Sequence, residues 1–262
     1  SVARRYEPWL PRGLHVVTPN KRAGAGPLAR WRALRDTAKR SRSHFFYEAT
    51  VGAGLPVITT LRDLIATGDR VLQVEGILSG TLSYVFSAFA GDASFSAVVR
   101  EAKRLGYTEP DPRDDLSGMD VARKLVILAR EMGVEIDVED VVVESLVPEA
   151  LRGHGTVEAF LDGLAGWDEA MAQRRTEATR AGESLRYVGV VDHLGRASVS
   201  LRAYPATHPF ARVSGGDNVF AFRTQRYHAQ PLVVQGPGAG PEVTAGGVFA
   251  DVLRLAAYVG GD

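Results

Sequence analysis

One stretch organises the rest of the chain: Gly106-Tyr107-Thr108-Glu109-Pro110-Asp111-Pro112-Arg113-Asp114-Asp115-Leu116-Ser117-Gly118-Met119-Asp120-Val121-Ala122-Arg123-Lys124. Five carboxylates lie between Glu109 and Asp120, and two prolines stiffen the loop that carries most of them. We expect a helix to follow, with Ser117 as its N-cap and with Asp120, three positions later, as the second side chain of a capping box. Apolar residues then recur at helical spacing, and a glycine predicts the end: Val121, Leu125, Leu128, Met132 and Gly133.

Asp120 and Lys124 lie four residues apart, so they share a helix face that is distinct from this apolar stripe. A lysine beside carboxylates, at the mouth of a stiff acidic loop, is the kind of group that donates or accepts a proton. The alternative is a capping carboxylate plus one exposed helix pair, which is worth ~0.2–0.5 kcal/mol. The spacing leaves both interpretations open.

The bulk composition is that of an ordinary globular protein. The chain has 262 residues, enough for one large domain or two small ones, with 45% hydrophobic and 24% charged residues. Lys+Arg and Asp+Glu are equal at 31 each, so we expect neither a nucleic acid nor a membrane as partner. The absence of cysteine excludes disulfides and thiolate chemistry. No membrane-spanning apolar run or signal peptide is visible, and we expect a cytoplasmic protein.

The six histidines show no metal-ligand spacing, so we expect them to be surface or core residues. They are His15, His44, His154, His193, His208 and His228.

The first third of the chain reads as part of an α/β sheet. A helical pattern over residues 1–12 precedes a short strand at 14–18, and Lys21 follows its carboxyl end, where open α/β sheets bind ligands. Lys21 is therefore either a surface lysine or a site residue. A helix over 28–40 and a strand over 44–50 lead to Val51-Gly52-Ala53-Gly54-Leu55-Pro56, a tight turn before a helix to Ala66. Its GxG is too short for a dinucleotide fingerprint.

The rest of the chain predicts a mixed sheet backed by helices. Strands are expected over 70–76, 185–192, 197–204, 218–227 and 232–235, with an extended segment over 141–147. Alternation in 197–204 implies that one face of the sheet is wet. Helices are expected from Ser79, a plausible N-cap, to residue 90 and over 95–105, 156–164 and 167–181. The glycine-rich turn at 236–240 precedes a last helix, but no strand follows that would complete an independent phosphate site.

The long acidic run resembles the signature of homoserine dehydrogenases. Four further segments resemble motifs of that family in the same order: HVVTPNK, VGAGLP, EGILSGT and GPGAGPEVTAGGVFADVLR. The resemblance covers about residues 15–254. It implies the NAD(P)H-dependent reduction of aspartate 4-semialdehyde to homoserine, often in the C-terminal half of a bifunctional aspartokinase–homoserine dehydrogenase.

The resemblance also implies roles for individual residues. Lys124 would be the proton donor, with Asp115 a further acid at the site. Glu109 and Asp120 would hold the amino end of a small-molecule substrate, with Tyr107 and Thr108 beside them. The residues near the NADP or NAD cofactor would be Lys21, Ser79, Gly106 and Gly240. A structural monovalent cation, Na⁺ or K⁺, would be bound by Glu48, Val51, Ala53 and Leu55.

The implied fold is α/β (α+β): a remnant of a Rossmann-like nucleotide domain plus a mixed-sheet substrate and dimerisation domain with helices on one face. We assign residues 1–56 and 241–262 to the former and 57–240 to the latter, and we expect a homodimer or a higher homo-oligomer. Complete family members begin with a strand, a glycine-rich turn and a helix, and none precedes Ser1. We therefore expect a truncated form that binds NADPH poorly.

Two other functions stay open. The chain could be a non-catalytic substrate-binding and dimerisation module that lacks its cofactor domain, and a measurable oxidation of homoserine with NADP would separate this from the enzyme. Another amino-acid dehydrogenase with similar domains would not be expected to share the acidic loop.

Overall fold

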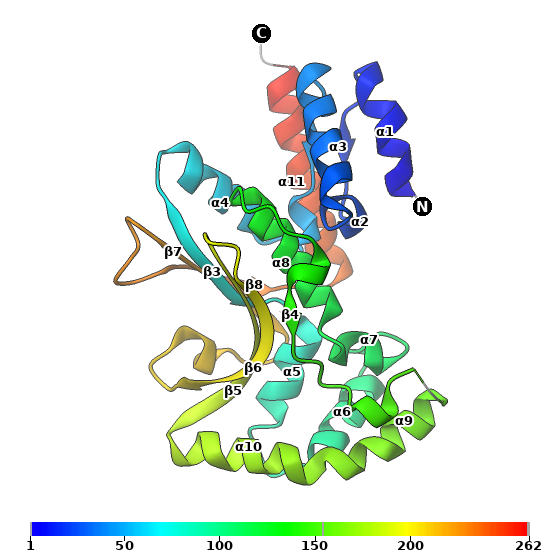
Figure 1. The fold of residues 1–262 in the computed structure, drawn as a ribbon, viewed down its shortest axis with the longest axis vertical. Helices are drawn as coiled ribbons and strands as arrows, with labels where there is room; N and C mark the ends of the chain where they lie inside the picture. The colour runs from blue at the N-terminus through cyan, green and yellow to red at the C-terminus, as the bar shows by residue number, and fades with distance from the viewer. Residues whose placement is uncertain (1, 154, 261–262) are drawn as a thin grey trace.

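The computed structural model describes residues 2–153 and 155–260, and its centre is a mixed six-stranded sheet (Figure 1). The strand order is β4-β6-β5-β3-β7-β8, and every neighbouring pair is antiparallel except β4 and β6. A separate parallel pair, β1-β2, lies outside this sheet. The strands are β1 Val16–Val17, β2 Phe45–Phe46, β3 Val71–Ile77, β4 Val142–Val143, β5 Glu183–Asp192, β6 Ala197–Pro205, β7 Asp217–Thr224 and β8 Leu232–Pro237. The predicted mixed sheet is confirmed.

The helices gather at the two ends of the molecule and along one face of the sheet (Figure 1). At one end α1, α3 and α11 lie near the strand pair, and at the other end lie α5, α6, α9 and α10, with α8 between them. The α-helices are α1 Tyr6–Trp9, α2 Lys21–Gly24, α3 Leu28–Arg40, α4 Val57–Ala66, α5 Gly80–Ala88, α6 Phe95–Arg104, α7 Pro112–Leu116, α8 Met119–Glu131, α9 Val157–Gly163, α10 Asp168–Arg180 and α11 Pro241–Val259. Short 3₁₀ turns are η1 Val2–Arg5, η2 Leu10–Arg12, η3 Glu48–Thr50, η4 Val138–Asp140, η5 Glu149–Leu151, η6 Leu164–Trp167 and η7 Pro209–Arg212.

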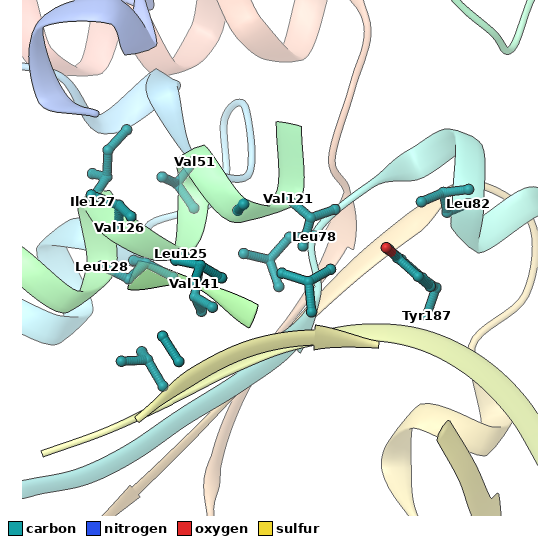
Figure 2. Packing of buried hydrophobic residues seen from close by; sticks show 14 of the residues in the cluster. Val51, Leu78, Leu82, Val121, Leu125, Val126, Ile127, Leu128, Val141 and Tyr187 are labelled. Carbon is teal, nitrogen blue, oxygen red and sulfur yellow. The ribbon is translucent and has the colours of Figure 1, made fainter. Parts of the chain in front are cut away.

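Helix α8 is buried on several sides. The predicted stripe of Val121, Leu125 and Leu128 is buried in the main core, and Figure 2 shows Val121 and Leu125 beside Leu78. Helices α2 and α4 contact α8 as well, so Val126 and Ile127 are also buried. Burial of each such side chain stabilises the fold by ~1.5–3 kcal/mol. A helix enclosed in this way carries any polar side chain on it into the interior.

The start of α8 differs from the prediction. Gly118, with φ 74°, is the N-cap, whereas Ser117 closes the preceding short helix α7. The sequence predicts only a loop there, but Pro112 takes the first helical position of α7 and the Asp111 side chain accepts from Arg113 N at 3.0 Å. Ser117 keeps a weaker role, because its hydroxyl accepts from Met119 N at 3.3 Å.

The glycines at both ends of α8 adopt left-handed conformations for different reasons. Gly133, with φ 81°, ends the helix as predicted: its N–H donates to Arg130 O at 3.2 Å and Val134 N donates to Ala129 O at 2.9 Å. Gly118 is also pressed against the sheet, since a β-carbon there would lie 2.2 Å from the Tyr187 hydroxyl. That hydroxyl donates to Glu144 O at 2.6 Å and is held in place.

The predicted strand over 44–50 is mostly wrong, because only Phe45–Phe46 pairs as a strand and Glu48–Thr50 turns as η3. The buried Glu48 carboxylate instead caps α4, accepting from Ile58 N at 2.7 Å and Thr59 N at 2.9 Å. Its own N–H donates to the Asp251 carboxylate of α11 at 2.8 Å. These distant partners bend the chain where local sequence favours a strand.

The β5–β6 hairpin is confirmed, with Gly195 at φ 87° in its turn. The face opposite α8, which we expected to be wet, is partly covered. Tyr204 and Phe210 are buried there in a second apolar cluster that includes residues of β3, β5 and β7. The η7 turn that follows β6 therefore covers part of that face.

No helix among the described residues is long and apolar enough to cross a membrane. Ser1 and His154 lie outside the described residues. Within residues 2–153 and 155–260 there is no cluster of three metal-binding side chains, and the rings of His15 and His44 simply pack at 5.2 Å.

We predict that Gly118→Ala destabilises the protein by more than 2 kcal/mol, because a left-handed alanine costs ~1–2 kcal/mol and its β-carbon would collide with Tyr187, at ~1–3 kcal/mol. Gly133→Ala is the matched control, since position 133 has a similar φ but open space around it. Urea unfolding of both variants measures the difference. Equal losses would show that the contact with Tyr187 contributes nothing.

Candidate active site

A cavity of about 630 Å³ lies where the acidic loop, α2, the start of α5 and the glycine-rich turn before α11 meet. It brings together most of the residues singled out from the sequence: Lys21, Ala53, Ser79, Gly106, Tyr107, Glu109, Asp115, Asp120, Lys124 and Gly240. Thr108, Glu48, Val51 and Leu55 are not among the residues that line it. Segments from six parts of the chain therefore form one site, since residues of the 49–53 turn and residues 216 and 217 line it as well.

Asp120 bridges two lysines in this cavity. Its Oδ1 lies 3.0 Å from Lys21 Nζ and its Oδ2 lies 3.0 Å from Lys124 Nζ. The Lys124 side chain is only 11% exposed, which is too buried for the exposed helix pair that the spacing had left open. The arrangement is a paired, buried ammonium at the edge of a cavity.

Lys124 has a second acceptor, the carbonyl of Leu78, at 2.7 Å from Nζ. Burial lowers the pKa of Lys124, and Lys21 lowers it further, while Asp120 and Asp115 oppose the shift. The net direction is downward. Its proton is therefore released more readily than that of an exposed lysine, as a general acid near neutral pH requires.

The Asp120 carboxylate stays ionised. Burial alone would raise its pKa, but the Lys124 and Lys21 ammonium groups outweigh it and lower the pKa of Asp120 to about 2. An ionised carboxylate at this point forms ion pairs with both lysines, and it places a permanent negative charge at the cavity.

The acidic loop is anchored before any ligand arrives. Asp115 accepts from Glu109 N at 2.8 Å, and Thr81 of α5 donates to Tyr107 O at 2.6 Å. The Tyr107 ring stacks on Tyr84 with centroids 4.3 Å apart. Burial raises the pKa of Asp115, and the Glu109 and Asp120 carboxylates add to that rise. Thr108 supports the same loop by donating to Glu109 O at 2.8 Å.

The adjoining wall is mostly backbone. Ser79 is the N-cap of α5, as predicted, and its hydroxyl accepts from Leu82 N at 3.2 Å. Gly240 stands at the N-terminus of α11 with φ 122°. Glycines 80, 216, 238 and 240 leave the chain accessible along this wall. Helix N-termini beside exposed backbone and Lys21 favour a flat, anionic ligand such as a nucleotide cofactor, so the residues fit such a group.

The 48–55 turn has the oxygen-rich character that a hard monovalent cation requires. Gly52 and Ala53 both adopt positive φ, at 78° and 53°, which turns the backbone sharply beside buried Glu48. Burial raises the pKa of Glu48, although its hydrogen bonds from Thr59 and Ile58 and the charge of Arg254 oppose this. Arg254 lies 3.5 Å from the carboxylate. The carboxylate and nearby carbonyl groups could therefore act as cation ligands, with one guanidinium competing for the same charge.

Sequence reasoning missed three contributors: the Leu78 carbonyl, Thr81 and Asn218. Asn218 is fully buried and its Nδ2 donates to Leu78 O at 3.3 Å. A polar residue directly before the apolar run Val219-Phe220-Ala221-Phe222 was the available signal. A backbone carbonyl gives no signal in a sequence.

Comparisons with known proteins identify the family of the chain. A family model described as homoserine dehydrogenase matches residues 56–253, and one described as homoserine dehydrogenase, NAD binding domain, matches residues 1–48. Bifunctional aspartokinase/homoserine dehydrogenase 2 of Arabidopsis thaliana is 57% identical over 261 residues, covering 99% of this chain and 28% of that protein. The homoserine dehydrogenase of Schizosaccharomyces pombe is 45% identical, covering 99% of this chain and 71% of that protein.

Solved structures show the same fold. A crystal structure of a Candida auris protein of unknown function superposes with a TM-score of 0.94 at 45% identity, covering 97% of this chain and 73% of that one. A hyperthermophilic archaeal homoserine dehydrogenase in complex with NADPH superposes with a TM-score of 0.74 at 25% identity, covering 97% and 67%. The chain spans less than a third of the plant relatives and about seven-tenths of the fungal ones.

We predict that the stability contributed by Asp120 depends on pH. Its pKa falls on folding from the ordinary value of 3.8 to about 2, so the contribution is complete above about pH 4 and is lost as the pH falls towards 2. Urea unfolding of the wild type and Asp120→Asn across this range should show a gap that narrows on acidification. Asp36→Asn, at an exposed position on α3, is the control. A gap that does not change with pH would contradict the two-lysine pairing.

Proposed function

Because the chain belongs to the homoserine dehydrogenase family, we propose that its cavity converts aspartate 4-semialdehyde to homoserine with NADP or NAD as cofactor. The observation that carries this proposal is the buried Lys124 ammonium, which is paired with Asp120 and faces a cavity large enough for a small amino acid beside a nicotinamide. The cofactor, when bound, supplies the hydride that reduces the aldehyde carbon.

Lys124 is the proposed proton donor. As the aldehyde is reduced, its oxygen gains negative charge, and Lys124 Nζ transfers a proton to that oxygen to give the alcohol. Asp120 and the Leu78 carbonyl hold Nζ in place, at 3.0 Å and 2.7 Å. In the reverse direction the neutral amine accepts the same proton.

The carboxylates on the acidic loop are the proposed binding site for the ammonium group of the substrate. Glu109, Asp115 and Asp120 line one side of the cavity, and the hydrogen bond between Glu109 N and Asp115 fixes two of them relative to each other. Tyr107 forms part of the adjoining wall, and Thr108 supports the Glu109 backbone. Carboxylates that are already held in place orient the ammonium group of a small zwitterion, so little additional side-chain freedom is lost when the substrate binds.

The cofactor would lie along the backbone wall. Ser79, Gly106 and Gly240 line that side, and Lys21 lies at its edge with its ammonium group paired to Asp120. The archaeal relative was solved with NADPH, which supports a nicotinamide cofactor here. We propose in addition that Glu48 and the carbonyls of Val51, Ala53 and Leu55 bind a structural Na⁺ or K⁺.

We further propose that residues 1–56 with 241–262 form the nucleotide-binding part and 57–240 the substrate-binding part, and that the chain assembles as a homodimer or higher homo-oligomer. The matches at 1–48 and 56–253 support a boundary near residue 56. The plant relatives are chloroplastic by name, so the cytoplasmic location stays a prediction.

We predict that Lys124→Ala lowers kcat for the oxidation of homoserine by ~10²–10⁴-fold, the usual contribution of a general acid or base, and changes KM only a few-fold. Lys39→Ala, at an exposed position on α3, is the matched control. Steady-state assays with homoserine and NADP or NAD measure both constants. Unchanged turnover in Lys124→Ala would remove the lysine from this role. Binding of homoserine with no oxidation by the wild type would instead favour a non-catalytic module.

We predict that Na⁺ or K⁺ raises the Tm of the protein above its value in choline chloride of equal ionic strength, because a ligand bound only by the folded state stabilises it. Glu48→Gln should abolish the difference. Equal melting temperatures in the three salts would contradict a cation at the 48–55 turn.

A further inference from the structure

The carbonyl of Leu78 is shared by two donors. Lys124 Nζ lies 2.7 Å from it and Asn218 Nδ2 lies 3.3 Å from it. Leu78 directly follows β3 and Asn218 is on β7, and the register of these antiparallel strands places the two residues opposite each other, next to the pair Ile77–Val219. The amide of Asn218 therefore contacts the same oxygen as the ammonium of Lys124.

Burying the Asn218 side-chain amide at this location costs folding free energy. Asn218 is fully buried, and within residues 2–153 and 155–260 its Oδ1 has no hydrogen-bond partner. A buried acceptor without a partner is destabilising, whereas an apolar side chain of the same shape avoids that penalty. Gly238 packs directly against the amide, because a β-carbon at position 238 would lie 2.0 Å from Asn218 Cγ. A polar side chain kept under these conditions indicates a role for the one hydrogen bond that it makes.

We propose that Asn218 is a positioning residue for Lys124: its amide fixes the orientation of the Leu78 carbonyl, which in turn holds the lysine ammonium at the cavity. The proposal rests on the proposed function, in which Lys124 is the proton donor. Leu78 lies one residue beyond the last paired position of β3, Ile77, and directly before the Ser79 cap, so its carbonyl is oriented by the side chains that donate to it. The Asn218 amide supplies that constraint from the neighbouring strand.

The charged groups around Lys124 explain why this acceptor matters. Asp120 of α8, Lys21 of α2, Asp115 of α7 and Glu109 of the acidic loop face the same space. Asp120 is shared with Lys21, so it attracts Nζ towards α2. The Leu78 carbonyl attracts Nζ from the sheet side. If that carbonyl turns away, Nζ shifts towards Asp120 and its charged form loses a hydrogen bond.

The test uses two variants of nearly the same shape in the full chain. Asn218→Leu removes the donor and should lower kcat by about 10- to 100-fold, because small displacements of a catalytic group are costly. It should also move the Lys124 pKa further downward, since the ammonium loses an acceptor. Asn218→Asp places a carboxylate near the ammonium and should move that pKa upward. Ser83→Ala is the control: within the described part of the chain Ser83 Oγ is also buried and without a hydrogen-bond partner, so it does not bond to Leu78 O as Asn218 does.

Two measurements separate failure of this proposal from failure of the proposed function. The pH profile of kcat reports on catalysis, and NMR titration of ¹³C-lysine-labelled protein reports the Lys124 pKa without any activity. Opposite displacements in the Leu and Asp variants, with none in Ser83→Ala, support the proposal. An unchanged Lys124 titration in both variants, or equal displacement in the control, overturns it. If Asn218→Leu does not fold, Asn218→Ala, which also removes the donor to Leu78 O, takes its place, and an unchanged Lys124 titration in it overturns the proposal. A wild type that binds NADPH but shows no dehydrogenase activity rejects the proposed function, while the titration still tests the role of Asn218.

Discussion

A buried ammonium must be paired, and this requirement at Lys124 shapes the surrounding structure. A charge left alone in a protein interior costs several kcal/mol, so the lysine is tolerated only because Asp120 and the Leu78 carbonyl both reach it. One of these groups lies on α8 itself and the other between β3 and α5. Lys21 approaches from α2 on the other side of Asp120. The site therefore exists only when helix, sheet and N-terminal segment are packed together.

The far end of α8 is held by a second buried charge. The Glu131 side chain is 3% exposed and accepts two hydrogen bonds from Arg62 of α4, at 2.7 Å and 3.0 Å, as well as one from the Tyr47 hydroxyl. Arg35 of α3 lies 3.2 Å from the same carboxylate. Burial would raise the pKa of Glu131, but Arg62 and Arg35 outweigh it and lower the pKa. One turn of α8 thus joins α3, α4 and the segment after β2, and Arg130 next to it donates to the carbonyls of Gly24 and Gly26 at 2.7 Å.

The parts of this structure that sequence could predict are those with local causes. The apolar stripe of α8, its glycine stop, the Ser79 cap and the β5–β6 hairpin all follow from spacing or from a single turn residue. The family resemblance implies that Lys21, Glu109, Asp115 and Lys124 belong to one site, and one cavity contains all four. No local sequence pattern predicts this, because residues 21 and 124 are far apart in the chain. The errors have distant causes. The strand expected at 44–50 is bent by Ile58, Thr59 and Asp251, and the Leu78–Asn218 contact depends on strand register.

The contact between Gly118 and Tyr187 limits how this site can be redesigned. Asparagine, the usual substitute for a left-handed glycine, also has a β-carbon, which would meet the Tyr187 oxygen. Removing that oxygen to make room would leave the Glu144 carbonyl without the donor it has now. A library aimed at new substrates should therefore keep residues 118 and 187 together as wild type.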